Sequence, residues 1–194
     1  MNLDLLLPED RTTIGEFGLF LSHDLDMIVT LDDRTKRIVD IADSRIHGKG
    51  YHALRDIAEG DLVMTAYGVV IGHQTEQHSI QHAMEVHLQP FTYGGKYLNH
   101  SCDSNLIVRS NERGIANFFA SRPIKTREEV TYHYPMTEFE WAPTSEEKGN
   151  PCNCKSTKCE GIIESFSMLT LPGQKVLVDS GYVSSYLAKW FKEQ

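Results

Sequence analysis

The chain has 194 residues, of which 40 % are hydrophobic and 24 % charged, values typical of a globular protein with one well-filled core. No apolar run approaches the roughly 18–20 residues of a membrane helix, and the acidic start of the chain does not resemble a secretory signal. We therefore expect an intracellular protein, nuclear or cytoplasmic, with no membrane partner. The net charge of −8 argues against direct binding to nucleic acid and suits a basic partner such as a lysine-rich peptide.

Short hydrophobic runs separated by glycine and polar turns predict β-strands along most of the chain. The predicted strands cover residues 17–21, 27–29, 38–41, 51–54, 61–67, 69–71, 79–84, 106–108, 115–120 and 130–134. Residues 32–36 are expected to form a polar hairpin tip, and residues 138–150 a polar connection. The pattern indicates a β-rich α+β protein built of small sheets with short helices.

Two stretches between the predicted strands have compositions that suggest a binding site as well as a turn. Gly48 and Gly50 flank Lys49, and such glycines permit positive φ and a close approach of the backbone to a ligand. The alternative for Lys49 is a solvated loop lysine. Residues 99–102 place an amide, an imidazole, a hydroxyl and a thiol in an apolar setting, where each polar group requires a partner if it is buried. Asn99 and His100 could equally be a satisfied pair that only fixes the turn.

The four cysteines predict a metal site. Disulfides are disfavoured in a reducing compartment, and inert core thiols would not crowd three cysteines into eight polar residues. A tetrahedral zinc site uses all four thiols and leaves none over. Its ligands would be Cys102, Cys152, Cys154 and Cys159.

A second metal site is the weaker alternative, because four histidines recur every four or five residues but no Asp, Glu or Cys repeats with them at a ligand spacing. These histidines are His73, His78, His82 and His87.

Near the end of the chain, five apolar residues follow the period of an amphipathic helix that is expected to dock on the same chain. They are Val183, Tyr186, Leu187, Trp190 and Phe191.

Four blocks of the sequence resemble, in order, the motifs of SET-domain lysine methyltransferases. They are G-K-G-Y with R-D-I-A-E-G at residues 48–60, K-Y-L-N-H-S-C-D-S-N at 96–105, E-V-T-Y-H-Y at 129–134, and the cysteine segment at 152–161. The resemblance covers about residues 38–163. It implies a fold of small twisted sheets with a knot-like threading and a zinc-bound post-SET segment. The implied division is an N-terminal β-rich extension (1–37), a SET domain (38–135), a linker with the post-SET zinc segment (136–163) and a helical extension (164–194).

The resemblance also implies S-adenosylmethionine (SAM) as cofactor, bound opposite a channel that admits the substrate lysine. Tyr134 would be the catalytic tyrosine, and Tyr132 would line the channel where the family controls the number of methyl groups added. Cofactor-binding residues would be Lys49, Gly50, Tyr51, Lys96, Asn99 and His100. As an alternative, Tyr132 and Tyr134 share one face of the predicted strand and could be core aromatics.

Methyl transfer requires a neutral amine, whereas free lysine has a pKa of about 10.4. A narrow apolar channel beside a positive sulfonium lowers that pKa and excludes water. Three residues depart from the family pattern: Lys96 stands for an arginine, His133 for an aspartate and Lys155 for a common glycine.

The favoured function is SAM-dependent lysine N-methylation of a histone or another protein. The substrate peptide would add to a sheet edge beside acidic side chains. Those side chains are Glu138, Glu140, Glu146 and Glu147. The alternatives are a SET-fold module that binds cofactor or peptide without transfer, and a SET fold diverted to a small molecule.

Overall fold

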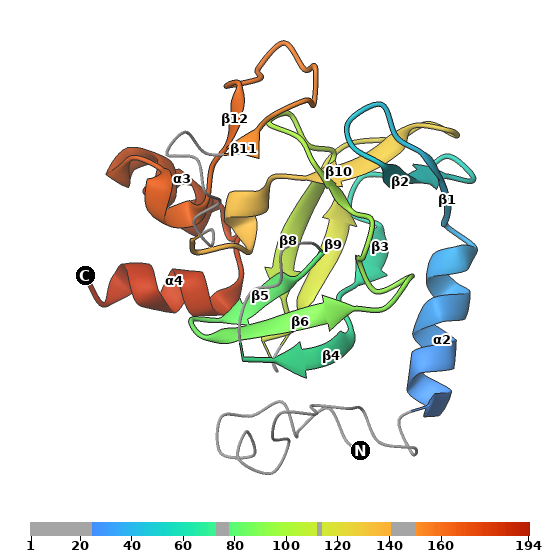
Figure 1. Cartoon of the computed structure of the whole chain (residues 1–194), viewed down its shortest axis with the longest axis horizontal. Helices are drawn as coiled ribbons and strands as arrows, with labels where there is room; N and C mark the ends of the chain where they lie inside the picture. The colour runs from blue at the N-terminus through green and yellow to red at the C-terminus, as the bar shows by residue number, and fades with distance from the viewer. Residues whose placement is uncertain (1–24, 73–77, 112–113, 141–149) are drawn as a thin grey trace.

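The computed structural model describes residues 25–72, 78–111, 114–140 and 150–194 (Figure 1). Its main sheet has seven strands, with the order β1-β2-β10-β8-β9-β3 and β7 paired to β10. These strands are β1 (Val39–Asp43), β2 (Lys49–Ala53), β3 (Leu62–Thr65), β7 (Asn99–His100), β8 (Leu106–Ser110), β9 (Ala116–Ala120) and β10 (Glu129–Tyr132). A second sheet has the order β4-β6-β5, and a third pairs β11 with β12. Their strands are β4 (Gly68–Ile71), β5 (Ile80–Ala83), β6 (Val86–Pro90), β11 (Asn150–Pro151) and β12 (Ile162–Ile163).

Strand β10 lies at the centre of the arrangement. It is antiparallel to β2 and parallel to both β7 and β8. The register places Val130 opposite Tyr51, and Tyr132 opposite both His100 and Leu106. Segments about eighty and about thirty residues apart in sequence thus become neighbours. The predicted β-rich fold is confirmed, while the knot-like threading stays a prediction.

One main hydrophobic core fills the space between the sheets. Val39, Tyr51, Leu106, Phe118 and Val130 are all fully buried in it. Strand β8 begins with a short apolar run of three buried residues, as expected where both faces of a strand are covered, whereas burial alternates along β9. Among the described residues, no helix is long and apolar enough to cross a lipid bilayer.

The beginning of the described chain is a helix, α2 (Leu25–Lys36), at one end of the molecule (Figure 1). The predictions of a strand at 27–29 and a hairpin tip at 32–36 were therefore wrong. Isoleucine and valine favour strands locally, but Asp32 and Lys36 form an i,i+4 ion pair of 3.3 Å. Arg34 and Lys36 also lie in the last turn, where the helix dipole favours cations. The strand predicted at 17–21 lies outside the described residues.

Two helices at the opposite end of the molecule follow the cysteine segment (Figure 1). The predicted amphipathic helix is α4 (Ser185–Lys192), whose Leu187 is fully buried against Phe166 and Val183. Its docking on the same chain is confirmed. Helix α3 (Leu171–Ser180) was missed, although its ends carry recognisable signals. Thr170 caps the first turn by accepting from the Gly173 N–H, and Gly181 ends the helix at φ 70°.

Two further differences from the predicted strands concern β6 and β10. Strand β6 was missed because its residues are buried on both faces and show no alternation. Strand β10 ends at Tyr132, two residues earlier than predicted. Tyr134–Met136 form a 3₁₀ turn (η5), with Pro135 near its start. A second 3₁₀ turn, η6, spans Phe166–Met168. Tyr134 therefore leaves the strand face that Tyr132 occupies.

Candidate functional site

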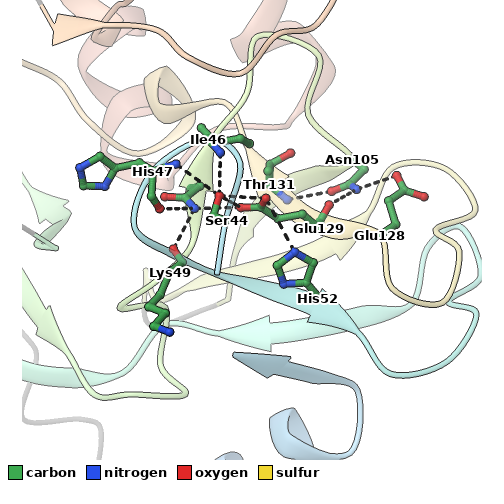
Figure 2. Close-up of polar contacts among 10 residues, drawn as sticks. Ser44, Ile46, His47, Lys49, His52, Asn105, Glu128, Glu129 and Thr131 are labelled. Carbon is green, nitrogen blue, oxygen red and sulfur yellow. Dashed lines mark hydrogen bonds and ion pairs between the residues drawn. The ribbon is translucent and has the colours of Figure 1, made fainter. Parts of the chain in front are cut away.

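A network of hydrogen bonds fixes the loop before β2 against β10 (Figure 2). The Asn99 side-chain amide donates to the backbone carbonyls of His47 (3.2 Å) and Lys49 (2.9 Å) and to Glu129 Oε1 (2.8 Å). The Ser44 hydroxyl also contacts the Glu129 carboxylate, at 2.8 and 3.0 Å, and accepts from the backbone N–H of Ile46 and His47. Asn99 is 7 % exposed, so the network is largely shielded from water. We call this set, Ser44, Asn99 and Glu129, the Asn99 network.

Gly48 and Gly50 serve this network in different ways. Gly48 adopts φ 47°, a left-handed conformation that side chains disfavour. At Gly50, an added Cβ would lie 2.3 Å from Glu129 Oε1 and 3.1 Å from Asn99 Nδ2. A side chain at this position would push the carboxylate away from its donors. The first glycine is required by backbone conformation and the second by close approach.

Tyr134 contacts residues 98–100 through both its backbone and its side chain. Its N–H donates to His100 Nδ1 (3.2 Å), and its hydroxyl donates to the Leu98 carbonyl (3.1 Å). Burial, together with the charge of Glu138, raises the pKa of Tyr134 above its usual value. The hydroxyl therefore stays protonated at neutral pH in a fixed orientation. The Tyr132 and Tyr134 rings lie 4.8 Å apart between centroids, so the two predicted tyrosines are brought together.

His100 is neutral, and its contacts define its tautomer. Burial, with a smaller contribution from His133, lowers the pKa of His100 to about 3. Because Nδ1 accepts from the Tyr134 N–H, the ring proton must lie on Nε2. Nε2 is 3.4 Å from Cys102 Sγ and donates to it. His133, one of the departures from the family pattern, lies beside this ring with centroids 5.4 Å apart.

The four cysteines converge as the sequence predicted. Their sulfur atoms all lie within 4.8 Å of one another, and all four thiols are free. Tetrahedral zinc with bonds of about 2.3 Å would separate its sulfur ligands by about 3.8 Å, and the distance between Cys102 Sγ and Cys152 Sγ is 3.7 Å. The donor set and its spacing thus fit a structural zinc ion. The N–H of His100 Nε2 is the kind of outer contact that orients a metal ligand.

The other residues predicted to bind cofactor occupy varied positions. The Lys49 ammonium is exposed and pairs with Asp43 at 2.6 Å. Tyr51 is fully buried, and its hydroxyl donates to the Thr92 carbonyl and accepts from the Tyr97 N–H. The Lys96 ammonium lies 5.6 Å from the centre of the Tyr97 ring. The side chain of Tyr51 therefore supports the loop from within the core.

His78 lies near this site, although from the sequence it was only one of the four histidines of the weaker second metal site. Its ring packs edge-on against Tyr97 at 5.6 Å between centroids, and its backbone has φ 66°. Burial, followed by the charge of Lys96, lowers the pKa of His78. A positive φ outside glycine is uncommon and often marks a functional position. The histidine spacing pointed to a metal and not to this ring contact or positive φ, because both of these features depend on tertiary contacts.

Glu138 is not where the sequence predicted it. We expected it on the surface, beside a docked peptide, but it is 1 % exposed and cannot serve that purpose. Its Oε1 accepts from the Gln81 N–H (3.0 Å) and from the Thr137 hydroxyl (2.9 Å). Glu140 is exposed, whereas the other two acidic residues of that prediction, Glu146 and Glu147, lie outside the described residues.

Comparison with known proteins gives a family match and relatives for the segments that meet at this site. Residues 48–135 match the family described as the SET domain. SUVR5 of Arabidopsis thaliana, a histone-lysine N-methyltransferase, is 36 % identical over 75 residues, which are 35 % of this chain and 5 % of that protein. The H3 lysine-36-specific histone-lysine N-methyltransferase of Mycosarcoma maydis is 28 % identical over 157 residues, which are 70 % of this chain and 15 % of that protein. The chain thus spans a small part of these relatives.

Solved structures show the same fold at low identity. The methyltransferase domain of human SETMAR has a TM-score of 0.51 and 21 % identity, covering 66 % of this chain and 58 % of that one. KRYPTONITE in complex with DNA, an H3(1-15) peptide and SAH has a TM-score of 0.53 and 22 % identity, covering 65 % and 29 %.

Proposed function

We propose, because residues 48–135 match the family described as the SET domain, that this chain transfers a methyl group from SAM to a lysine side chain of a protein. The observation that carries the proposal is the meeting of three blocks at β10. The Asn99–His100 strand, the Gly48–Gly50 turn and Tyr134 are joined by direct hydrogen bonds. The named activities of the relatives and the SAH and H3 peptide of KRYPTONITE support the same chemistry.

The proposed cofactor site is the loop that the Asn99 network holds in place. Gly50 allows the backbone to lie close to the Glu129 carboxylate. The Tyr51 hydroxyl holds the loop of Thr92 and Tyr97 from within the core. The buried His100 ring would form the base of the cofactor site. Lys49 and Lys96 would bring positive charge to the carboxylate of the bound cofactor. SAM, when bound, supplies an electrophilic methyl group on a sulfonium.

The two tyrosines are proposed to receive the substrate amine. The Tyr134 hydroxyl donates a hydrogen bond to the Leu98 carbonyl, which fixes its oxygen in an orientation proposed to position an amine or to contact the polarised methyl group. Tyr132, packed against it, would line the channel. Positioning the amine in line with the methyl group supplies much of the rate acceleration expected for such a reaction.

Zinc is proposed to hold the cysteine segment against the site. Cys102 lies two residues after His100, whose ring contacts both Cys102 and Tyr134. Binding of zinc by the four thiols would therefore fix residues 152–159 beside the turn that positions the catalytic tyrosine. Zinc has a structural function here and takes no part in methyl transfer.

The proposed substrate is a lysine-rich protein, with histone H3 as the first candidate. The net charge of −8 favours a basic partner. The named relatives are histone-lysine methyltransferases, which favours the nucleus as the place of action.

The test is transfer of labelled methyl groups from SAM to core histones and to an H3(1–15) peptide. Replacing Tyr134→Phe removes one oriented hydroxyl and is expected to lower the rate at least about 100-fold. Tyr182→Phe, outside the site, is the matched control and should leave the rate unchanged. Cofactor binding without transfer to any protein would indicate a binding module, and transfer only to small molecules in an extract would indicate a diverted SET fold.

A further inference from the structure

A chain of buried hydroxyls joins Tyr132 to a carboxylate in the protein interior. The Tyr132 hydroxyl lies 3.1 Å from Thr137 Oγ1, and the Thr137 hydroxyl donates to Glu138 Oε1 at 2.9 Å. Tyr132, Thr137 and Glu138 are 3 %, 0 % and 1 % exposed. None of the functions derived so far uses Thr137 or Glu138.

The direction of these hydrogen bonds follows from counting protons. Thr137 has one hydroxyl proton, and it goes to the carboxylate. The Tyr132 hydroxyl must therefore donate to Thr137. The lone pairs of the Tyr132 oxygen are then available to accept an N–H on the side proposed to receive the substrate.

Glu138 is poorly stabilised as an anion. Oε1 accepts two hydrogen bonds, but Oε2 is buried and has no hydrogen-bond partner among the described residues. Burial raises the pKa of Glu138 to about 7. A buried carboxylate with one unpaired oxygen has a strong tendency to take up a proton.

Among the described residues, the ionisable groups on which the charge of this carboxylate acts are three tyrosines. They are Tyr132 on β10, Tyr134 on η5 and Tyr186 on α4, and burial keeps the pKa of each above its usual value. From β5 comes the Gln81 N–H, while η6 approaches only the Glu138 backbone, through the Phe166 N–H. In the described parts of the chain, no ion pair joins Glu138 to a cation. Of these groups, Glu138 alone can accept a proton near neutral pH.

We propose that Glu138 is the proton acceptor that neutralises the substrate lysine, through the hydroxyls of Tyr132 and Thr137. The proposal rests on the methyl transfer proposed above. The lysine ammonium gives a proton to the Tyr132 oxygen, the Tyr132 proton passes to Thr137, and the Thr137 proton passes to Glu138 Oε1. The products are a neutral amine, two intact hydroxyls and a carboxylic acid. After the product leaves, the proton returns along the same hydroxyls to water.

The kinetic test is a pH profile of single-turnover methylation of the H3(1–15) peptide. In the unmodified protein, the rate should level off above the pKa of Glu138. Glu138→Gln should lower the rate at neutral pH by about 100-fold and restore it near pH 10, where lysine loses its proton to water. Thr137→Val should behave alike, and the double variant should be no slower than either, as expected for groups that act as one unit.

Two controls separate the relay from a structural effect. Thr137→Ser keeps the hydroxyl and should retain the profile of the unmodified protein, whereas Glu59→Gln changes an exposed carboxylate and should have no effect. A Glu138→Gln variant that kept the original profile would overturn the relay and leave the methyltransferase function standing.

A second measurement does not depend on activity. With ¹³C-labelled glutamate and tyrosine, the Tyr132 Cζ resonance should titrate with the same midpoint as the Glu138 carboxyl, and Thr137→Val should abolish the Tyr132 response. If Tyr132 does not follow Glu138, the relay is wrong whatever the enzyme does. If the two titrate together in a protein that methylates nothing, the hydrogen-bonded chain is supported and the proposed function fails instead.

Discussion

The Asn99 network and the cysteine cluster both begin in residues 99–102, but they are held together by different means. In the network, Asn99 donates to two carbonyls and to Glu129, so the chain supplies its own donors and acceptors. In the cluster, four free thiols converge, and the nearest regular structure is a pair of two-residue strands, β11 and β12. Hydrogen bonds within the chain therefore fix the Asn99 network, whereas the cysteine cluster has the donor set of a metal site.

Of the changes predicted here, removal of zinc should produce the largest difference in stability between the cysteine cluster and the Asn99 network. Structural zinc of this kind contributes on the order of 10–16 kcal/mol of apparent binding free energy, comparable to the stability of a whole domain. After chelation, residues 150–163 should lose amide-exchange protection while β1, β2 and β10 keep theirs. Hydrogen exchange with and without chelator measures this.

Zinc content supplies the control for that experiment. The purified protein should carry one zinc per chain, and Cys154→Ser should lower the occupancy. Protein without stoichiometric zinc, or with equal protection in both states, would contradict the contrast between the two regions.

The next effect concerns Glu138, a carboxylate that lacks the full set of donors that Glu129 has. Its raised pKa means that the folded state binds more protons than the unfolded state between about pH 4.5 and pH 7. The free energy of unfolding should therefore fall as the pH rises through this window. A pKa raised from 4.5 to about 7 corresponds to about 3 kcal/mol, fully lost above pH 7.

Urea unfolding of the protein and of Glu138→Gln at a series of pH values measures this loss. The difference between their unfolding free energies should change by that amount across the window. A constant difference would show that Glu138 titrates as an ordinary carboxyl.

Asn99→Ala disrupts the Asn99 network, which is held by hydrogen bonds within the chain. The Glu129 carboxylate and the Lys49 carbonyl lose their shared donor, which costs about 2 kcal/mol of unfolding free energy. Zinc content should not change, because Asn99 is not a metal ligand. Thermal unfolding together with zinc analysis tests both statements, and parallel loss of zinc would show that the two regions are coupled.

The smallest effect is expected at Lys155, beside the cysteine ligands. It adopts φ 57° where the family commonly has glycine, so the departure seen in the sequence has a conformational cost. Lys155→Gly should stabilise the folded protein by about 1 kcal/mol. The gain should appear only with zinc bound, since the segment is expected to be ordered only then. An equal gain after chelation would contradict that.

Local chemistry made much of the site predictable. The thiol spacing and the N-H-S-C block indicated which residues would meet, because ligand types and polar pairs have few alternatives once buried. The helix over residues 25–36 was not predicted, since Ile28 and Val29 favour strands locally while the ion pair and dipole contacts favour a helix. Glu138 could not be placed either, because a glutamate in a polar run gives no sign that other segments will cover it.

The sequence by itself determined the β-rich class, the cluster of four thiols and the glycine-flanked turn, all of which depend on residue type and spacing along the chain. Only the tertiary structure decided that β10 lies between β2, β7 and β8, that Tyr134 turns away from its strand, and that a carboxylate is enclosed behind Tyr132. The physical reason is that burial and proton affinity are set by atoms from distant segments, which no local pattern contains.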